Sequence, residues 1–110
     1  RTFFVNFEHL TIHTRADVEA VRAEIESRLA PLGHKVWGVI NYDHFVLDEQ
    51  VQDDWAEMVR ELVERHYVDV TRYTTSTFLR MKLGDELAKR EVAPHLYESK
   101  NEAHKHLKET

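Results

Sequence analysis

Polar side chains that can hold an anion follow two apolar runs of the chain. Asn41 and Asp43 come directly after the apolar run 36–40, and Arg72 lies near the end of the run 68–73, just before Thr75 and Ser76. If both runs are parallel strands, their carboxyl ends lie at the edge of the sheet where such folds bind ligands. Thr75 and Ser76 also open a helix pattern, whose free N–H groups favour an anion. The pattern predicts a site for an anion or carboxylate.

The same residues also have a purely structural interpretation. Thr75 or Ser76 can cap the following helix, as such residues do on most helices. Arg72 can then form an ion pair with Asp43. This alternative needs no ligand, and the sequence leaves both interpretations open.

The eight histidines of the chain do not form a recognisable metal motif. His9 and His13 have the four-residue interval of helical ligands, but they lie outside any predicted helix. His104 and His106 are two residues apart, which turns them to different faces of a helix. We therefore predict no metal site and expect loop and surface histidines that gain charge below about pH 6.5.

The sequence also lacks the residue patterns expected for acid–base catalysis or for nucleotide binding. The adjacent acids at 48–49 and 53–54 diverge by about 100° on a helix, so neither pair can share one proton. They fit the start of a helix instead, where the dipole favours negative charge. The chain has no Walker loop and no G-x-G-x-x-G segment. We predict neither catalytic residues nor a cofactor within these residues.

Composition excludes several further classes. The chain has 110 residues, a net charge of −5 and no cysteine. That charge has the wrong sign for a nucleic-acid binder, and no apolar run approaches the roughly 20 residues of a membrane helix. The lack of cysteine excludes disulfides and thiol catalysis and fits a cytoplasmic protein. The chain begins without Met, in the approach to a strand, which we interpret as the sign of a fragment of a longer protein.

Strand and helix patterns alternate four times along the chain. Strands are predicted at 3–7, 36–40, 68–73 and 95–97. Helices follow Thr14, the loop before Val51, the segment 74–76, and Ser99 or Asn101. The first has an apolar stripe that runs from Val18 to Leu32. The order predicts one α/β domain over residues 1–110, with a four-stranded, mainly parallel sheet and about four helices.

Aromatic residues divide into two groups. Five are expected to pack in the core, namely Trp37, Trp55, Tyr67, Tyr73 and Phe78. The opening strand is different, because it places Phe3, Phe4 and Phe7 within five residues. We leave its role open between the core and a contact with a preceding domain or a second subunit.

Three segments resemble the STAS, or anti-sigma-factor-antagonist-like, fold. They are residues 35–41, 76–85 and 95–107, which look like the central strand, the helix after the third strand, and the closing strand and helix of that family. The resemblance covers nearly the whole chain and implies a single STAS-like domain. Switch proteins of the family carry a phosphorylated Ser or Thr where the second helix begins. Residues 45–54 contain no hydroxyl and several acids, so we do not expect such a switch here.

A closer resemblance is to the C-terminal extension of long bacterial acyl-CoA:acetate/3-ketoacid CoA-transferase-like proteins. It is carried by residues 4–8, 40–43, 70–76, 78–84 and 92–95. The resemblance implies a parent enzyme that uses coenzyme A as substrate and a Glu in a Gly-containing loop as nucleophile. No Gly here closely follows a Glu, so we expect the catalytic Glu outside this chain.

The resemblance thus implies a non-catalytic accessory domain for assembly or regulation. Its expected partners are the preceding transferase domains of the same chain and further copies in a homo-oligomer, with neither nucleic acid nor membrane. The alternative is a stand-alone STAS-like regulatory module that binds a protein partner.

Overall fold

Six strands and four helices make up the part of the chain that the structure, a computed structural model, describes: residues 2–109. Arg1 and Thr110, with which the predicted domain begins and ends, lie outside the described residues. The strands are β1 (Thr2–Asn6), β2 (Thr11–Ile12), β3 (Val36–Asn41), β4 (Val46–Leu47), β5 (Tyr67–Tyr73) and β6 (Leu96–Tyr97). The helices are α1 (Arg15–Leu29), α2 (Gln52–His66), α3 (Thr77–Ala88) and α4 (Lys100–Glu109).

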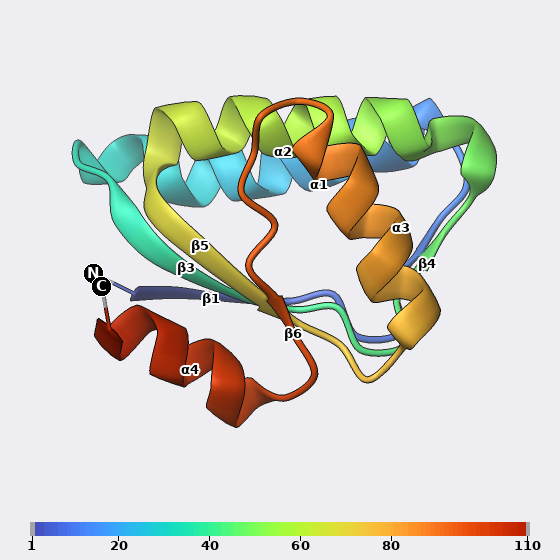
Figure 1. Cartoon of the computed structure of the whole chain (residues 1–110). Helices are drawn as coiled ribbons and strands as arrows, with labels where there is room; N and C mark the ends of the chain where they lie inside the picture. Colours follow the sequence, from blue (N-terminus) through green and yellow to red (C-terminus); the bar gives the residue numbers. More distant parts are fainter. Residues whose placement is uncertain (1, 110) are drawn as a thin grey trace.

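Four of the strands form one parallel sheet in the order β1-β3-β5-β6. Helices α1 and α2 cover one face, α4 lies on the opposite face, and α3 packs beside α2 and β6 (Figure 1). The predicted α/β fold with a four-stranded parallel sheet and four helices is confirmed. The prediction that residues 36–40 form an interior strand is also confirmed, because β3 lies between β1 and β5.

The remaining two strands were not predicted. β2 and β4 form a small parallel pair in which Thr11 lies opposite Val46 and Ile12 opposite Leu47. The pattern at 41–47 suggests only a loop with apolar anchors, because a two-residue ladder is too short to show a period. The pair joins the loop after β1 to the loop after β3 and buries Ile12.

Helix α1 begins as its sequence predicts and ends earlier. The Thr14 hydroxyl accepts from the Asp17 N–H and the Asp17 carboxylate accepts from the Thr14 N–H, which completes a capping box. After Leu29 the chain tightens into a short 3₁₀ turn that contains Pro31. Leu32 therefore leaves the apolar stripe of the helix and is 45% exposed.

An aromatic cluster forms the centre of the core between the sheet and α2. Trp55 is fully buried, and its ring lies 5.4 Å from Phe7, 5.0 Å from Phe45 and 6.4 Å from Tyr42, centroid to centroid. Of the residues expected in the core, Trp55 and Tyr67 are buried, and Trp37 and Tyr73 are partly buried.

The prediction for Phe78 is wrong, because its side chain is 71% exposed. Helix α3 turns Leu79, Leu83 and Leu87 toward the core. Phe78 is one residue before that stripe and thus about 100° away from it around the helix. Lys82 lies over the exposed ring, with its Nζ 5.2 Å from the centroid.

Candidate functional site

The polar residues at the ends of β3 and β5 do meet at the carboxyl edge of the sheet. The Asp43 carboxylate accepts two hydrogen bonds through Oδ1, from the Thr75 hydroxyl at 2.6 Å and from the Thr75 N–H at 2.8 Å. The Asn41 side-chain oxygen accepts from the Asp43 N–H at 2.8 Å, and its Nδ2 donates to Asn6 at 3.2 Å. The cluster thus links the ends of three neighbouring strands.

At the start of α3, the donors that were expected to bind an anion already have partners. Ser76 is the N-cap, and its hydroxyl accepts from the Leu79 N–H at 3.1 Å. Asp43 is the anion that receives the Thr75 donors. Ser76 is therefore the helix cap that the structural interpretation expected at Thr75 or Ser76. Ligand binding at this edge of the sheet stays a prediction.

Arg72 points away from this cluster. Its side chain is fully buried, on the sheet face covered by α1 and α2, and it does not pair with Asp43. The guanidinium Nη1 donates to the carbonyl oxygen of Pro94 at 2.7 Å and to that of Ala93 at 3.3 Å. Both the ligand prediction and the structural alternative required Arg72 at the sheet edge, and both are corrected on this point.

Several polar groups converge around the buried guanidinium. The Tyr42 hydroxyl, the Trp55 indole N–H, the Tyr67 hydroxyl and two Arg72 nitrogens are buried without a hydrogen bond of normal geometry. Burial raises the pKa of Tyr42, although the positive charge of Arg72 opposes the shift. Burial also lowers the pKa of Arg72. A cavity of about 20 Å³ beside these groups has room for about one water molecule.

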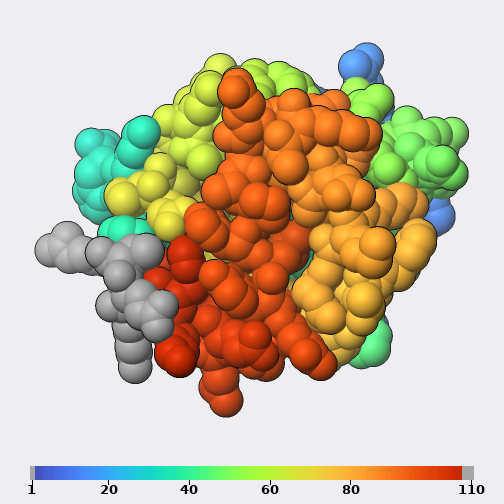
Figure 2. Space-filling model, viewed as in Figure 1, coloured from blue at the N-terminus to red at the C-terminus, as the bar shows by residue number. Residues whose placement is uncertain are grey.

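The chain from the end of α3 to β6 covers this buried centre from outside. In the space-filling view this segment forms the deep-orange surface on the side of the molecule where β6 lies (Figure 2). Its carbonyl groups at Ala93 and Pro94 are the acceptors of Arg72. The buried arginine thus fixes a connecting segment to β5, which is a structural role.

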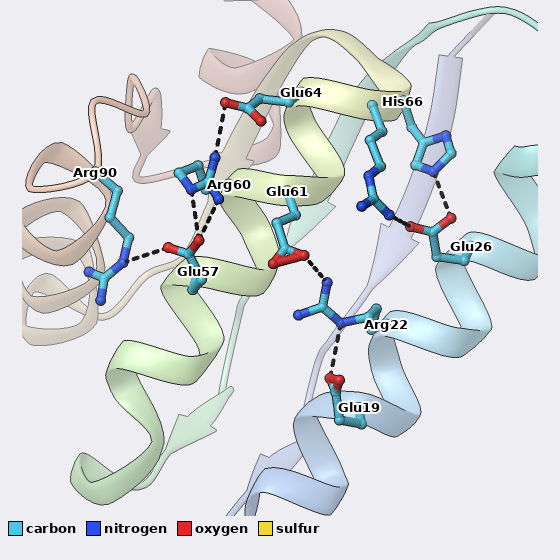
Figure 3. Close-up of polar contacts among 10 residues, drawn as sticks. Glu19, Arg22, Glu26, Glu57, Arg60, Glu61, Glu64, His66 and Arg90 are labelled. Carbon is cyan, nitrogen blue, oxygen red and sulfur yellow. Dashed lines mark hydrogen bonds and ion pairs between the residues drawn. The ribbon is translucent and has the colours of Figure 1, made fainter.

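Several acidic residues of α1 and α2 are engaged in ion pairs. Between α1 and α2, Arg22 lies between Glu19 and Glu61, and Glu26 accepts from His66 at 2.9 Å (Figure 3). Asp53 and Asp54, considered above as adjacent acids, pair separately with Arg90 and Arg15, each at 3.3 Å. These separate partners fit the prediction that the two acids do not share a proton.

An open groove of about 440 Å³ runs between β1 and α1. Its apolar lining includes Phe3, Val5 and Val21, with Glu24 and Arg28 among its polar residues. Within the described residues β1 pairs only with β3, so its outer edge is unpaired. On the other face of β1, Phe4 is 61% exposed and stacks on His104 at 5.8 Å between ring centroids.

One cluster was not predicted from the sequence. Asp69, His95 and His106 lie together between β5, the start of β6 and α4. Their spacings along the chain match no known motif, and only the packing of α4 on β5 brings them together. Burial lowers the pKa of His95, and the neighbouring Asp69 carboxylate opposes this shift.

Comparison with protein-family models, with curated proteins and with solved structures finds no match to this chain. Across residues 2–109, no helix combines the length and the apolar character needed to cross a bilayer.

The link between Asp43 and Thr75 leads to a test at low pH. Hydrogen bonds from the Thr75 hydroxyl and N–H hold the pKa of the Asp43 carboxyl below its usual range. Its contribution to stability is therefore complete above the pKa of the unfolded chain, about 4, and disappears as the pH falls through the lower folded value. We expect Asp43→Asn to lower the free energy of unfolding by about 1 kcal/mol at pH 7, because a neutral acceptor binds the same donors less strongly.

Urea unfolding at pH 7 and pH 3 measures this difference. The difference in the free energy of unfolding between the wild type and Asp43→Asn should be smaller at pH 3, where the Asp43 carboxylate is being protonated. Asp85→Asn changes an exposed acid on α3 and serves as control. An unchanged difference at the two pH values would contradict the assigned hydrogen bonds.

Proposed function

We propose that this chain is a non-catalytic accessory domain at the C-terminus of a bacterial acyl-CoA:acetate/3-ketoacid CoA-transferase-like protein. It serves assembly or regulation, and its partners are the preceding transferase domains and other copies in a homo-oligomer in the cytoplasm. The proposal rests on the sequence resemblance described above. The structural observation that carries it is the outer edge of β1, which is unpaired among residues 2–109 and lies beside an apolar groove.

This edge has the properties of a protein contact surface. An edge strand presents free N–H and C=O groups that can pair with another chain. Phe3 and Val5 line the groove on one face of β1, and Phe4 is exposed on the other. A partner that covers this edge would bury apolar side chains from both faces of the strand, at roughly 25 cal/mol per Å² of apolar area.

In this proposal the chemistry belongs to the transferase domains. A glutamate there forms the thioester with coenzyme A, and this domain holds no cofactor of its own. The hydrogen bond between the Thr75 hydroxyl and the Asp43 carboxylate supports this assignment of roles, because the two side chains bind each other.

A second candidate is a stand-alone STAS-like module that binds a regulatory protein partner. It is favoured by a different surface, on α3, where Phe78 is 71% and Met81 is 65% exposed. The two side chains are three residues apart and therefore lie on one side of the helix. They form an apolar patch of a kind that marks protein contacts.

Two matched substitutions distinguish these candidates. In the intact parent protein, Phe4→Asp is expected to reduce the mass of the assembly at a given concentration, because it places a charge in the β1 contact. Phe78→Asp changes another exposed phenylalanine, on α3, and should leave the mass unchanged. Light scattering after size-exclusion chromatography measures the mass, and thermal unfolding checks that both variants are folded. An effect of Phe78→Asp alone would place the protein contact on α3, the surface that favours the second candidate, and not on β1.

A further inference from the structure

Three side chains that commonly bind metals face one another on the side of the sheet covered by α4. The His95 Nε2 lies 3.5 Å from Asp69 Oδ1, and the His106 Nε2 lies 3.3 Å from Asp69 Oδ2. The two imidazole rings are 4.1 Å apart between centroids. One ligand atom from each of the three residues lies within 4.8 Å of the other two.

The three residues come from three separate parts of the chain that the fold holds in place. Asp69 is in β5, three residues before Arg72. His95 directly precedes β6, and its carbonyl oxygen accepts from the Arg72 N–H at 2.9 Å. His106 is on α4, which packs on β5. The position of the cluster is therefore set by the sheet and one packed helix and does not depend on an exposed loop.

The backbone at His95 is unusual. Its φ angle is 41°, in the left-handed region that non-glycine residues seldom occupy. Such a conformation is unfavourable and is concentrated at functional sites, and His9, His44 and Glu91 adopt it as well. Here it accompanies an imidazole that lies against Asp69 and His106.

The separations are close to those of ligands around one small ion. Two atoms that each lie about 2.1 Å from a tetrahedral Zn²⁺ are about 3.4 Å apart. The two nitrogen-to-oxygen separations, 3.5 Å to Oδ1 and 3.3 Å to Oδ2 of Asp69, are close to that value, and each imidazole approaches a different oxygen of the carboxylate. The ligand nitrogens of the two imidazoles lie within 4.8 Å of one another.

We propose that Asp69, His95 and His106 form a binding site for a first-row divalent metal ion of the Zn²⁺ class. Two imidazole nitrogens and one carboxylate oxygen suit Zn²⁺ or Fe²⁺, whereas Mg²⁺ and Ca²⁺ prefer oxygen ligands alone. The side chains of Asp69 and His95 are each 28% exposed, so water can reach the ion and complete its coordination.

A bound ion would join β5, the approach to β6 and the last helix at one point. Because it binds the folded chain, it raises the free energy of unfolding by mass action. Its effect should be largest on α4, which supplies His106 and packs on β5 through the buried Ala103 among other residues. This inference is independent of the proposed function, since it requires neither a partner nor coenzyme A.

The competing explanation is a hydrogen-bonded cluster with no affinity for metal. Calorimetric titration of ZnCl₂ into the metal-free 110-residue chain at pH 7.5 distinguishes a metal site from such a cluster. We expect one high-affinity Zn²⁺ per chain and a higher melting temperature. Asp69→Asn and His106→Gln should each weaken binding at least about tenfold, because even the loss of a residue that only orients a ligand costs 10–100-fold.

His9→Gln is the matched control, since His9 and His44 form a second histidine pair with ring centroids 4.9 Å apart. Loss of binding in this variant, or unchanged binding in Asp69→Asn and His106→Gln, would overturn the proposal. So would the absence of Zn²⁺ binding by the wild-type chain. Circular dichroism establishes whether the variants are folded.

A second measurement needs no variant. Substoichiometric Co²⁺, a paramagnetic ion of the same class, should broaden the ring proton signals of His95 and His106 in an NMR spectrum of the wild-type chain. The signals of His9, His34 and His44 should remain sharp. Broadening centred on His9 and His44 would assign the metal to the other pair and contradict the proposal.

Discussion

Replacing Trp55 with Ala is expected to lower the free energy of unfolding by about 3–5 kcal/mol, the usual cost of removing a large aromatic side chain from a core. Trp55 is fully buried, and its ring contacts those of Phe7 and Phe45. These rings join the loop after β1, the loop after β3 and α2, so the cavity would open where the helix meets the sheet. Because a small domain has only about 5–15 kcal/mol of stability, this change should bring it close to unfolding at 37 °C.

Urea unfolding followed by circular dichroism measures the effect. Phe78→Ala is the control, because it also truncates an aromatic residue but at a site that is 71% exposed. We expect it to change stability by less than about 0.5 kcal/mol. Similar losses in the two variants would mean that Trp55 does not occupy the centre of the core.

Arg72→Ala is expected to cost about 2–4 kcal/mol, for two separate reasons. The change leaves a cavity under α2, and it removes the donor that binds the carbonyl oxygens of Ala93 and Pro94. Arg72→Met keeps most of the side-chain volume and removes a buried charge that has no acidic partner in hydrogen-bonding range. Replacement of a buried charge by an apolar residue is often neutral or better, so Met should recover at least about 1 kcal/mol of the loss.

The same unfolding assay compares the two variants. Limited proteolysis adds a local readout, because release of the chain around Ala93 and Pro94 should make it more readily cleaved in Arg72→Ala. If neither variant changes stability or cleavage, the guanidinium does not hold this segment. If millimolar acetate stabilises the wild type and not Arg72→Ala, the side chain binds a carboxylate, as the sequence-based hypothesis proposed.

The fold could be predicted from the sequence because its elements have strong local signals. Thr14 and Asp17 mark the start of α1, and Pro31 marks the region of its end. The run at 36–40 is apolar on both faces, which indicates a central strand in a sheet covered on both sides. The short β2–β4 pair has no such signal, because its existence depends on where two distant loops meet.

The candidate site was less predictable because it depends on side-chain direction. In β5, alternate residues point to opposite faces, and Arg72 faces the core beneath α2. The sequence alone favours the edge for a charged residue, since an arginine is rarely fully buried. The cluster of Asp69, His95 and His106 was missed for a related reason. Its members become neighbours only through the β5–β6 pairing and the position of α4.

The accessory-domain proposal is tested most directly in the intact parent protein, compared with a version that lacks residues 1–110. Coenzyme A transfer between acetyl-CoA and short carboxylates and the mass in solution are measured on the same samples. We predict that turnover persists in the shortened protein, while the assembly becomes smaller or loses its response to acidic metabolites. Loss of turnover at unchanged mass would contradict the proposal, because it would place part of the catalytic machinery in this domain.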